Sequence, residues 1–279
     1  MLTDGARRMA RARGASPRAV VLALVFGALL TTGLGPLGRA STVRAGTAET
    51  MEAQVLAWVN NSRAARGLVP LRLHWQLVDL SGDRAATMAY YNTMSHTIAG
   101  CLSCQMDSRG IQRYSSGEVI GETGWPWGTQ AASSLFNAWR GSSYHWNLLM
   151  SSTYNYIGIG FAYNSAHTTT YGVIDMTESV DQSRPWAMMG TVKASGTTAT
   201  WTWSGADTAL QTHTSGLKNF DVQYRVDSGS WSTIRAGTTG QSLSLASRPH
   251  GHWYGLRVLS RDNRGYVSLW TSELRVWIP

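Results

Sequence analysis

The fold of this chain is decided by the stretch Tyr154-Asn155-Tyr156-Ile157-Gly158-Ile159-Gly160. It opens a predicted strand over 156–163, and a second strand is predicted over 168–176. The glycines lie within a strand, which is the wrong setting for a phosphate-binding loop. Because helical patterns precede these strands, the region from about 48 to 180 is predicted to be α+β, with the strands pairing with each other.

The helical patterns occupy three segments before the strands. Apolar residues recur at helical spacing around 51–59, 77–88 and 130–140. Gly67 is placed to end the first of these helices. Three helices are therefore predicted to pack around the strands.

The apolar pattern changes after residue 185, where its period becomes two. About seven short alternating segments, separated by turn residues, predict an all-β sandwich. The region holds no cysteine, which argues against a disulfide-centred immunoglobulin domain. We therefore expect an N-terminal segment over 1–45, one domain over 46–180 and a second domain over 186–279.

Residues 1–45 have the composition of an export signal. Seven arginines and one acid, Asp4, accompany an apolar run over 19–30. Candidate cleavage sites follow at 38–40 and 43–45. The run is shorter than the roughly 20 residues that span a bilayer, so a cleaved signal peptide is favoured. A retained N-terminal membrane anchor is the alternative, and in both cases the protein is expected to be secreted or associated with the cell envelope.

The formal net charge of +8 comes mainly from this leader. The remaining basic residues are dispersed, whereas binding to phosphate backbones needs them clustered. Nucleic acid is therefore not expected as a partner.

Cys101 and Cys104 are the only cysteines in the sequence. Outside the cytoplasm, a local disulfide between them is favoured. The alternative is half of a zinc site, because His96 lies just upstream. A Gly-x-Ser-x-Gly elbow and a His-Glu-x-x-His motif are both missing, so serine hydrolases and metzincin-type proteases have no direct support.

Four motifs carry a family resemblance over roughly 130 residues. They are Asn61-Ser62-Arg63 with the turn through Leu71, Met94-Ser95-His96-Thr97, Gly117-Glu118-Val119-Ile120, and Trp139 through His145 followed by 154–160. In this order they resemble the CAP superfamily of cysteine-rich secretory, antigen 5 and pathogenesis-related 1 proteins, also called SCP domains, in its bacterial secreted branch. The resemblance implies an α-β-α sandwich with a cleft where His96, Glu118 and His145 converge.

Residues 186–279 resemble a fibronectin type III module. The resemblance rests on Trp201, Tyr224-Arg225-Val226, residues 254–258 and residues 261–270. It implies a spacer or a binding platform, and the spacer is favoured.

The chemistry of the three cleft residues allows two uses. Neutral imidazoles bind divalent transition metals, so His96 and His145 are predicted to hold zinc or another divalent ion, with Glu118 as base. The same residues could transfer protons without a metal. Ser142 stands about where eukaryotic members of the family usually have a second glutamate. Glu122 is a candidate substitute, expected one helical turn or a short loop beyond Glu118. The loss of this glutamate weakens the case for catalysis.

Four aromatic residues are predicted to bind ligand. Tyr144 and Trp146 flank His145, while Trp125 and Trp127 flank Pro126 and could line a groove or pack a loop. The other five histidines are expected at the surface. We expect an exported protein whose cleft binds a divalent metal and an extracellular or envelope lipid, glycan or peptide without catalysis. The alternative is a secreted metal-dependent hydrolase or peptidase, so its status as an enzyme stays open.

Overall fold

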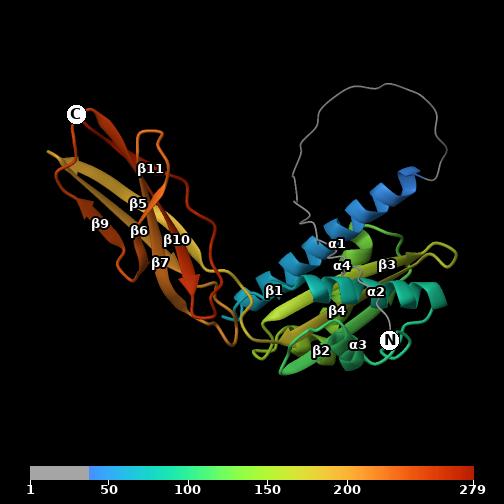
Figure 1. The fold of residues 1–279 in the computed structure, drawn as a ribbon. Coiled ribbons are helices and arrows are strands. Elements are labelled where there is room, and N and C mark those ends of the chain that lie inside the picture. Colours follow the sequence, from blue (N-terminus) through green and yellow to red (C-terminus); the bar gives the residue numbers. More distant parts are fainter. Residues whose placement is uncertain (1–37) are drawn as a thin grey trace, which may run out of the picture.

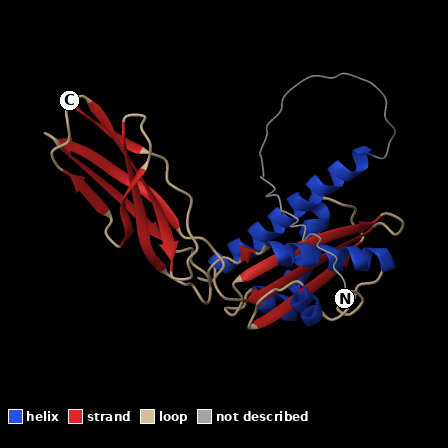
Figure 2. Ribbon diagram, in the orientation of Figure 1, coloured by secondary structure: helices blue, strands red, loops and turns tan. Residues whose placement is uncertain are grey.

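The computed structural model describes residues 38–279, with side chains from residue 49 onward. An N-terminal domain of helices around a sheet is followed by a β-sandwich beside one of its ends (Figure 1, Figure 2). The predicted α+β class is confirmed. Of the expected leader, residues 1–37 lie outside the described residues, and 38–45 belong to the first helix. None of the described helices is long and apolar enough to cross a membrane.

The N-terminal domain is built on a four-stranded sheet in the order β1-β3-β4-β2. Only β1 runs parallel to its neighbour β3. The predicted helices are α1, α2 and α4, and the predicted strands are β3 and β4. In chain order the elements are α1 (Gly38–Ala64), β1 (Arg72–Leu73), α2 (Trp75–Tyr91), α3 (Leu102–Ser108), β2 (Ser115–Thr123), α4 (Thr129–Gly141), α5 (Ser143–Leu149), β3 (Tyr156–Asn164) and β4 (Thr169–Glu178).

Helices cover both faces of this sheet, because alternate residues of each strand point to opposite sides. Ile157, Ile159 and Phe161 of β3 share a core with apolar residues of α1 and α4. On the other face, Tyr156 of β3 and Val173 of β4 are buried in clusters with residues of α2. The domain is therefore the expected α-β-α sandwich.

The glycines of β3 set how closely α2 lies on the sheet. A Cβ at Gly158 would come within 2.1 Å of the Leu77 carbonyl carbon, and one at Gly160 within 2.2 Å of the Gly82 nitrogen. Such contacts with rigid backbone cannot be relieved by turning a side chain. The Gly158-Ile159-Gly160 motif therefore lets α2 rest directly on β3.

The C-terminal region forms the predicted all-β sandwich. One sheet has the order β11-β10-β7-β8 and the other β5-β6-β9. Trp201 and Trp203 share a buried face, as their spacing predicts, and Phe220, Val222 and Leu256 pack with them. The strands are β5 (Trp186–Ser195), β6 (Thr198–Ala206), β7 (Leu217–Val226), β8 (Ser232–Thr238), β9 (Ser242–Leu245), β10 (His252–Asp262) and β11 (Leu274–Ile278).

The loop between β6 and β7 returns to the N-terminal domain. Leu210 is buried in a cluster with residues of α2, α3 and β3. Next to it, the Gln211 Oε1 atom accepts hydrogen bonds from the Val69 nitrogen at 2.7 Å and from Arg63 Nη2 at 3.4 Å. Burial lowers the pKa of Arg63 to about 10. The two domains thus share a packed contact that no periodic pattern had indicated.

We predict that Leu210→Ala destabilises the N-terminal domain although residue 210 belongs to the chain of the sandwich. Removing a buried leucine side chain costs about 2–5 kcal/mol, because the contacts are lost and a cavity is left. Leu269→Ala is the control, since Leu269 is 80% exposed. Thermal unfolding measures both, and an unchanged melting temperature for Leu210→Ala would contradict the packed contact.

Candidate functional site

Glu118 lies on β2 with its side chain toward α2, and only 8% of the residue is exposed. Both of its carboxylate oxygens are engaged. Oε2 accepts a hydrogen bond from Arg84 Nε within a buried ion pair, and Oε1 lies 2.5 Å from His96 Nδ1. The structure therefore brings two of the three predicted cleft residues into direct contact, with an arginine as their partner.

Arg84 connects several segments around this pair. Its guanidinium donates to the His96 carbonyl oxygen at 2.7 Å, to the Gly100 carbonyl oxygen at 3.2 Å and to Gln105 Oε1 at 3.1 Å. The loop that carries His96 and the start of α3 are thereby held against α2. This places the His96 ring over the Glu118 carboxylate.

A depression of about 320 Å³ opens above these residues. Half of the His96 side chain is exposed there, and the Tyr144 ring is largely exposed. His145 on α5 lies nearby: burial, and then the charge of His96, lower the pKa of His145. The depression is lined by His96, Leu102, Ser116, Gly117, Glu118, Tyr144 and Leu148.

His145 does not itself line this depression, and neither do four other candidates. Trp146 packs against the core beneath α1 and α4, and its ring meets Phe136 edge-on. Trp127 is partly buried against the same core, and Trp125 is half exposed in the loop after β2. Glu122 lies on β2 rather than on a helical turn or a short loop. At about 3.3 Å per residue it is roughly 13 Å from Glu118 along the strand.

Two further expectations are decided by the structure. The disulfide between Cys101 and Cys104 is confirmed, with Cα atoms 5.2 Å apart. His74 was expected at the surface, and this was wrong. It is buried at the start of α2, where Nε2 lies 3.0 Å from Gln182 Oε1 and the ring packs on Tyr156.

The side chains at this site can be compared with the ligands that the predicted metal ion would need. Catalytic zinc sites use three protein ligands, but both Glu118 oxygens already bind Arg84 and His96. Within residues 49–279, no group of three or more His, Cys, Asp or Glu side chains is arranged to hold a metal ion. The residues therefore do not fit a three-ligand centre, and a metal on His96 and His145 stays a prediction.

Sequence reasoning missed three buried polar residues at the site: Arg84, Ser81 and Asp175. Asp175 on β4 lies directly opposite Glu118 on β2. Ser81 Oγ donates to Asp175 Oδ2 at 2.8 Å, while Asp175 Oδ1 has no hydrogen-bond partner. The signal was present in α2, because Arg84 follows Leu77 and Leu80 at helical spacing and so falls on the buried face.

The comparison with known families agrees with this architecture. Residues 56–176 match the family model described as CAP, the cysteine-rich secretory protein family. This segment, which is less than half of the chain, is similar to a CAP domain. The match includes α2, β2, α4, β3 and the site residues His96, Glu118 and His145. No curated protein matches the chain.

Solved structures resemble parts of the chain. A cysteine-rich secretory protein from Staphylococcus aureus is 17% identical, with a TM-score of 0.39 over 47% of this chain and 39% of that one. An extracellular protein containing an SCP domain from Bacillus anthracis is 17% identical, with a TM-score of 0.42 over 53% and 45%. This chain thus spans less than half of either protein.

An Fn3-like protein from Clostridium thermocellum is 22% identical, with a TM-score of 0.26 over 35% of this chain and 96% of that one. The fibronectin type III likeness of the sandwich stays a prediction.

We predict that Arg84→Met destabilises the N-terminal domain by about 3–5 kcal/mol, because it leaves the buried Glu118 carboxylate without its cation. Adding Glu118→Gln should recover part of this loss. Arg109→Met is the control: its partner Asp83 is mostly exposed, so the expected cost is about 1 kcal/mol or less. Denaturant unfolding measures all three variants. An Arg84→Met loss no larger than that of Arg109→Met would contradict the assignment.

We also predict a pH dependence from Asp175. Burial, and then the Glu118 carboxylate, raise the pKa of Asp175 to about 7. The unfolded chain has the ordinary aspartate pKa of about 3.9, so the folded state loses stability as the pH rises from about 4 to about 7. Asp175→Asn stays neutral, so its melting temperature relative to wild type should rise between pH 5 and pH 8. Parallel pH profiles of the two proteins would contradict this.

Proposed function

We propose that the chain is an exported binding protein without catalytic activity. In this proposal the CAP domain holds a small glycan over His96, and the β-sandwich, a fibronectin type III-like module, acts as a spacer. The observation that carries the proposal is the engagement of both Glu118 oxygens by Arg84 and His96.

This engagement disfavours Glu118 as a catalytic base. A general base must reach the proton that it removes, and Glu118 is almost fully buried with both oxygens bonded. The alternative, a metal-dependent hydrolase using His96, His145 and Glu118, would first need the carboxylate to leave Arg84. Breaking a buried ion pair is costly, so the carboxylate instead serves to orient His96.

The oriented His96 ring and the residues beside it together offer groups that suit a polar ligand. If His96 Nδ1–H donates to Glu118, then Nε2 is left as an acceptor toward the depression. The exposed Tyr144 ring supplies a flat apolar surface, and Ser116 supplies a hydroxyl group beside it. A sugar matches this mixture of ring face and hydrogen-bonding groups better than an acyl chain, which needs mainly apolar walls.

Export is supported by the composition of residues 1–45 and by the Cys101–Cys104 disulfide. Disulfides persist in oxidising compartments outside the cytoplasm. The expected ligand is therefore an extracellular or envelope glycan.

The test is calorimetric titration of the full chain with a soluble oligosaccharide, beginning with tetra-N-acetylchitotetraose. His96→Ala and Tyr144→Ala are each expected to weaken binding about tenfold or more, a loss of roughly 1.4 kcal/mol. His167→Ala is the control, because His167 is an exposed histidine away from the depression. Equal binding by all variants would contradict the site. Chelator-sensitive hydrolysis that His96→Ala and His145→Ala both abolish would favour the hydrolase.

A further inference from the structure

A pocket of about 530 Å³ lies where the two domains meet. Its walls come from β1 and the start of α2, from the connection over 182–184, and from Tyr266 between β10 and β11. Figure 1 shows β1 at the end of the N-terminal domain that faces the sandwich. Tyr156 also lines the pocket and belongs to the same buried cluster as Leu210. The packing that joins the domains therefore also shapes this pocket before any ligand binds.

Two arginines line the pocket without a partner for their charge. Within residues 49–279, where side chains are described, Arg72 and Arg184 make no ion pair and no side-chain hydrogen bond. No acidic side chain of these residues lines the pocket. Asp181 and Asp262 in the adjoining segments are buried and accept backbone hydrogen bonds. The pocket therefore presents positive charge that the protein itself does not neutralise.

The start of α2 adds to this positive potential. The first N–H groups of a helix lack partners inside the helix and carry partial positive charge. The N-cap residue His74 makes no side-chain capping bond, and the first turn of α2 holds no acidic residue. This helix start therefore reinforces the two arginines in favouring an anion.

The pocket also offers an aromatic face and an unused hydrogen-bond acceptor. The Trp75 residue is 70% exposed. Because Gln182 Oε1 can only accept, His74 Nε2 donates to it at 3.0 Å, and Nδ1 of the neutral ring is left as an acceptor. Nδ1 is buried and has no hydrogen-bond partner. A buried acceptor of this kind is costly until a donor reaches it.

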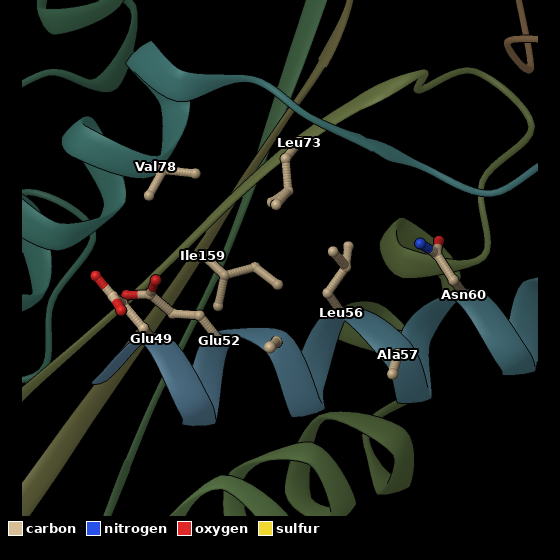
Figure 3. Close-up of a pocket in the computed structure, with 9 residues that line it drawn as sticks. Glu49, Glu52, Leu56, Ala57, Asn60, Leu73, Val78 and Ile159 are labelled. Carbon is tan, nitrogen blue, oxygen red and sulfur yellow. The ribbon is translucent and has the colours of Figure 1, made fainter. Parts of the chain in front are cut away.

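The neighbouring groove differs from the pocket in charge. This groove of about 420 Å³ lies between α1, α2 and β3 and shares Leu73 with the pocket (Figure 3). Figure 3 shows Glu49 and Glu52 pointing to one end of it, and its other lining residues are uncharged. An anion is therefore favoured in the pocket at the domain junction and disfavoured in the groove.

We propose that the pocket at the domain junction binds an acidic sugar, such as the carboxylated units of a polysaccharide. Its carboxylates pair with Arg72 and Arg184, and a sugar ring lies on the exposed face of Trp75. Hydroxyl groups of the sugar bond the Ser183 side chain and His74 Nδ1. The site is distinct from the depression at His96, which lies beside β2 at the opposite edge of the sheet.

The lining of the pocket favours a sugar acid over other small anions. The acyl chain of a fatty acid would leave the Ser183 hydroxyl and His74 Nδ1 without partners. An inorganic anion would pair with the arginines but would leave the Trp75 face uncovered. A sugar acid supplies the charge, the ring face and the hydroxyl groups together.

The test is calorimetric titration of the full chain with trigalacturonate. The matched ligand is its methyl ester, which keeps the rings and hydroxyl groups but removes the charge. The ester should bind about tenfold or more weakly than the acid, because it loses the charge-assisted hydrogen bonds. Equal binding of acid and ester, or no binding of the acid, overturns the proposal. Tighter binding of citrate or of adenosine 5′-phosphate than of trigalacturonate overturns the choice of a sugar.

Variants locate the binding in the pocket. Arg72→Gln, Arg184→Gln and Trp75→Ala should each weaken trigalacturonate binding about tenfold. Neither arginine has a partner to lose, so both glutamine variants should melt as wild type does, which separates lost binding from unfolding. Arg140→Gln is the matched control, because Arg140 is an exposed arginine of α4, which supplies no residue to the pocket. Unchanged binding when Arg72→Gln and Arg184→Gln are combined overturns the proposal.

One further variant separates this pocket from the site at His96. His96→Ala should bind trigalacturonate as wild type does, since His96 does not line the pocket. The glycan site proposed at His96 can therefore fail its own test while this one passes. Loss of trigalacturonate binding in His96→Ala with the pocket variants unaffected would contradict the assignment to the domain junction.

Discussion

The buried ion pair between Arg84 and Glu118 is the constraint on which the N-terminal domain depends. Two charges removed from water are tolerated only when geometry and further hydrogen bonds compensate for lost hydration. Here the compensation comes from several segments at once, because the guanidinium also bonds the His96 and Gly100 carbonyl oxygens. Placing α2 against β2 therefore also places the histidine loop and α3. The candidate site is thus a direct result of how one charge pair is buried.

Sequence patterns predicted the elements that are long enough for a repeating apolar pattern to be recognised. The helices α1, α2 and α4 and the strands β3 and β4 carry such patterns, and the sandwich carries period two. The seven-residue helices α3 and α5 are too short for a period to be recognised. The site was predicted in part: motifs identified Glu118 and His96, but not Arg84 or Asp175. Their contacts depend on strand register and on how α2 crosses the sheet, and spacing along the chain does not encode either.

Strand β3 explains why α2 packs tightly on one face of the sheet while a groove remains beside α1. Its alternation places Gly158 and Gly160 under α2, while Ile157 and Ile159 face α1. The glycines allow close packing on one face and leave no room for a ligand there. At its edge, β3 is longer than its neighbour β1. The space between α1 and α2 is therefore not filled by a further strand. An apolar groove and a tight helix contact thus arise beside one strand.

The packed loop over 207–216 has a mechanical consequence. With Leu210 inserted beneath α2 and Gln211 bonded to the turn after α1, the sandwich cannot swing freely about the short connection at 179–185. A tension applied to the C-terminal domain would pass through this loop into α2, the helix that carries Arg84. If the sandwich were anchored on a surface, the N-terminal domain would stand at a fixed angle to it, and a pull on that anchor would reach the helix beneath His96.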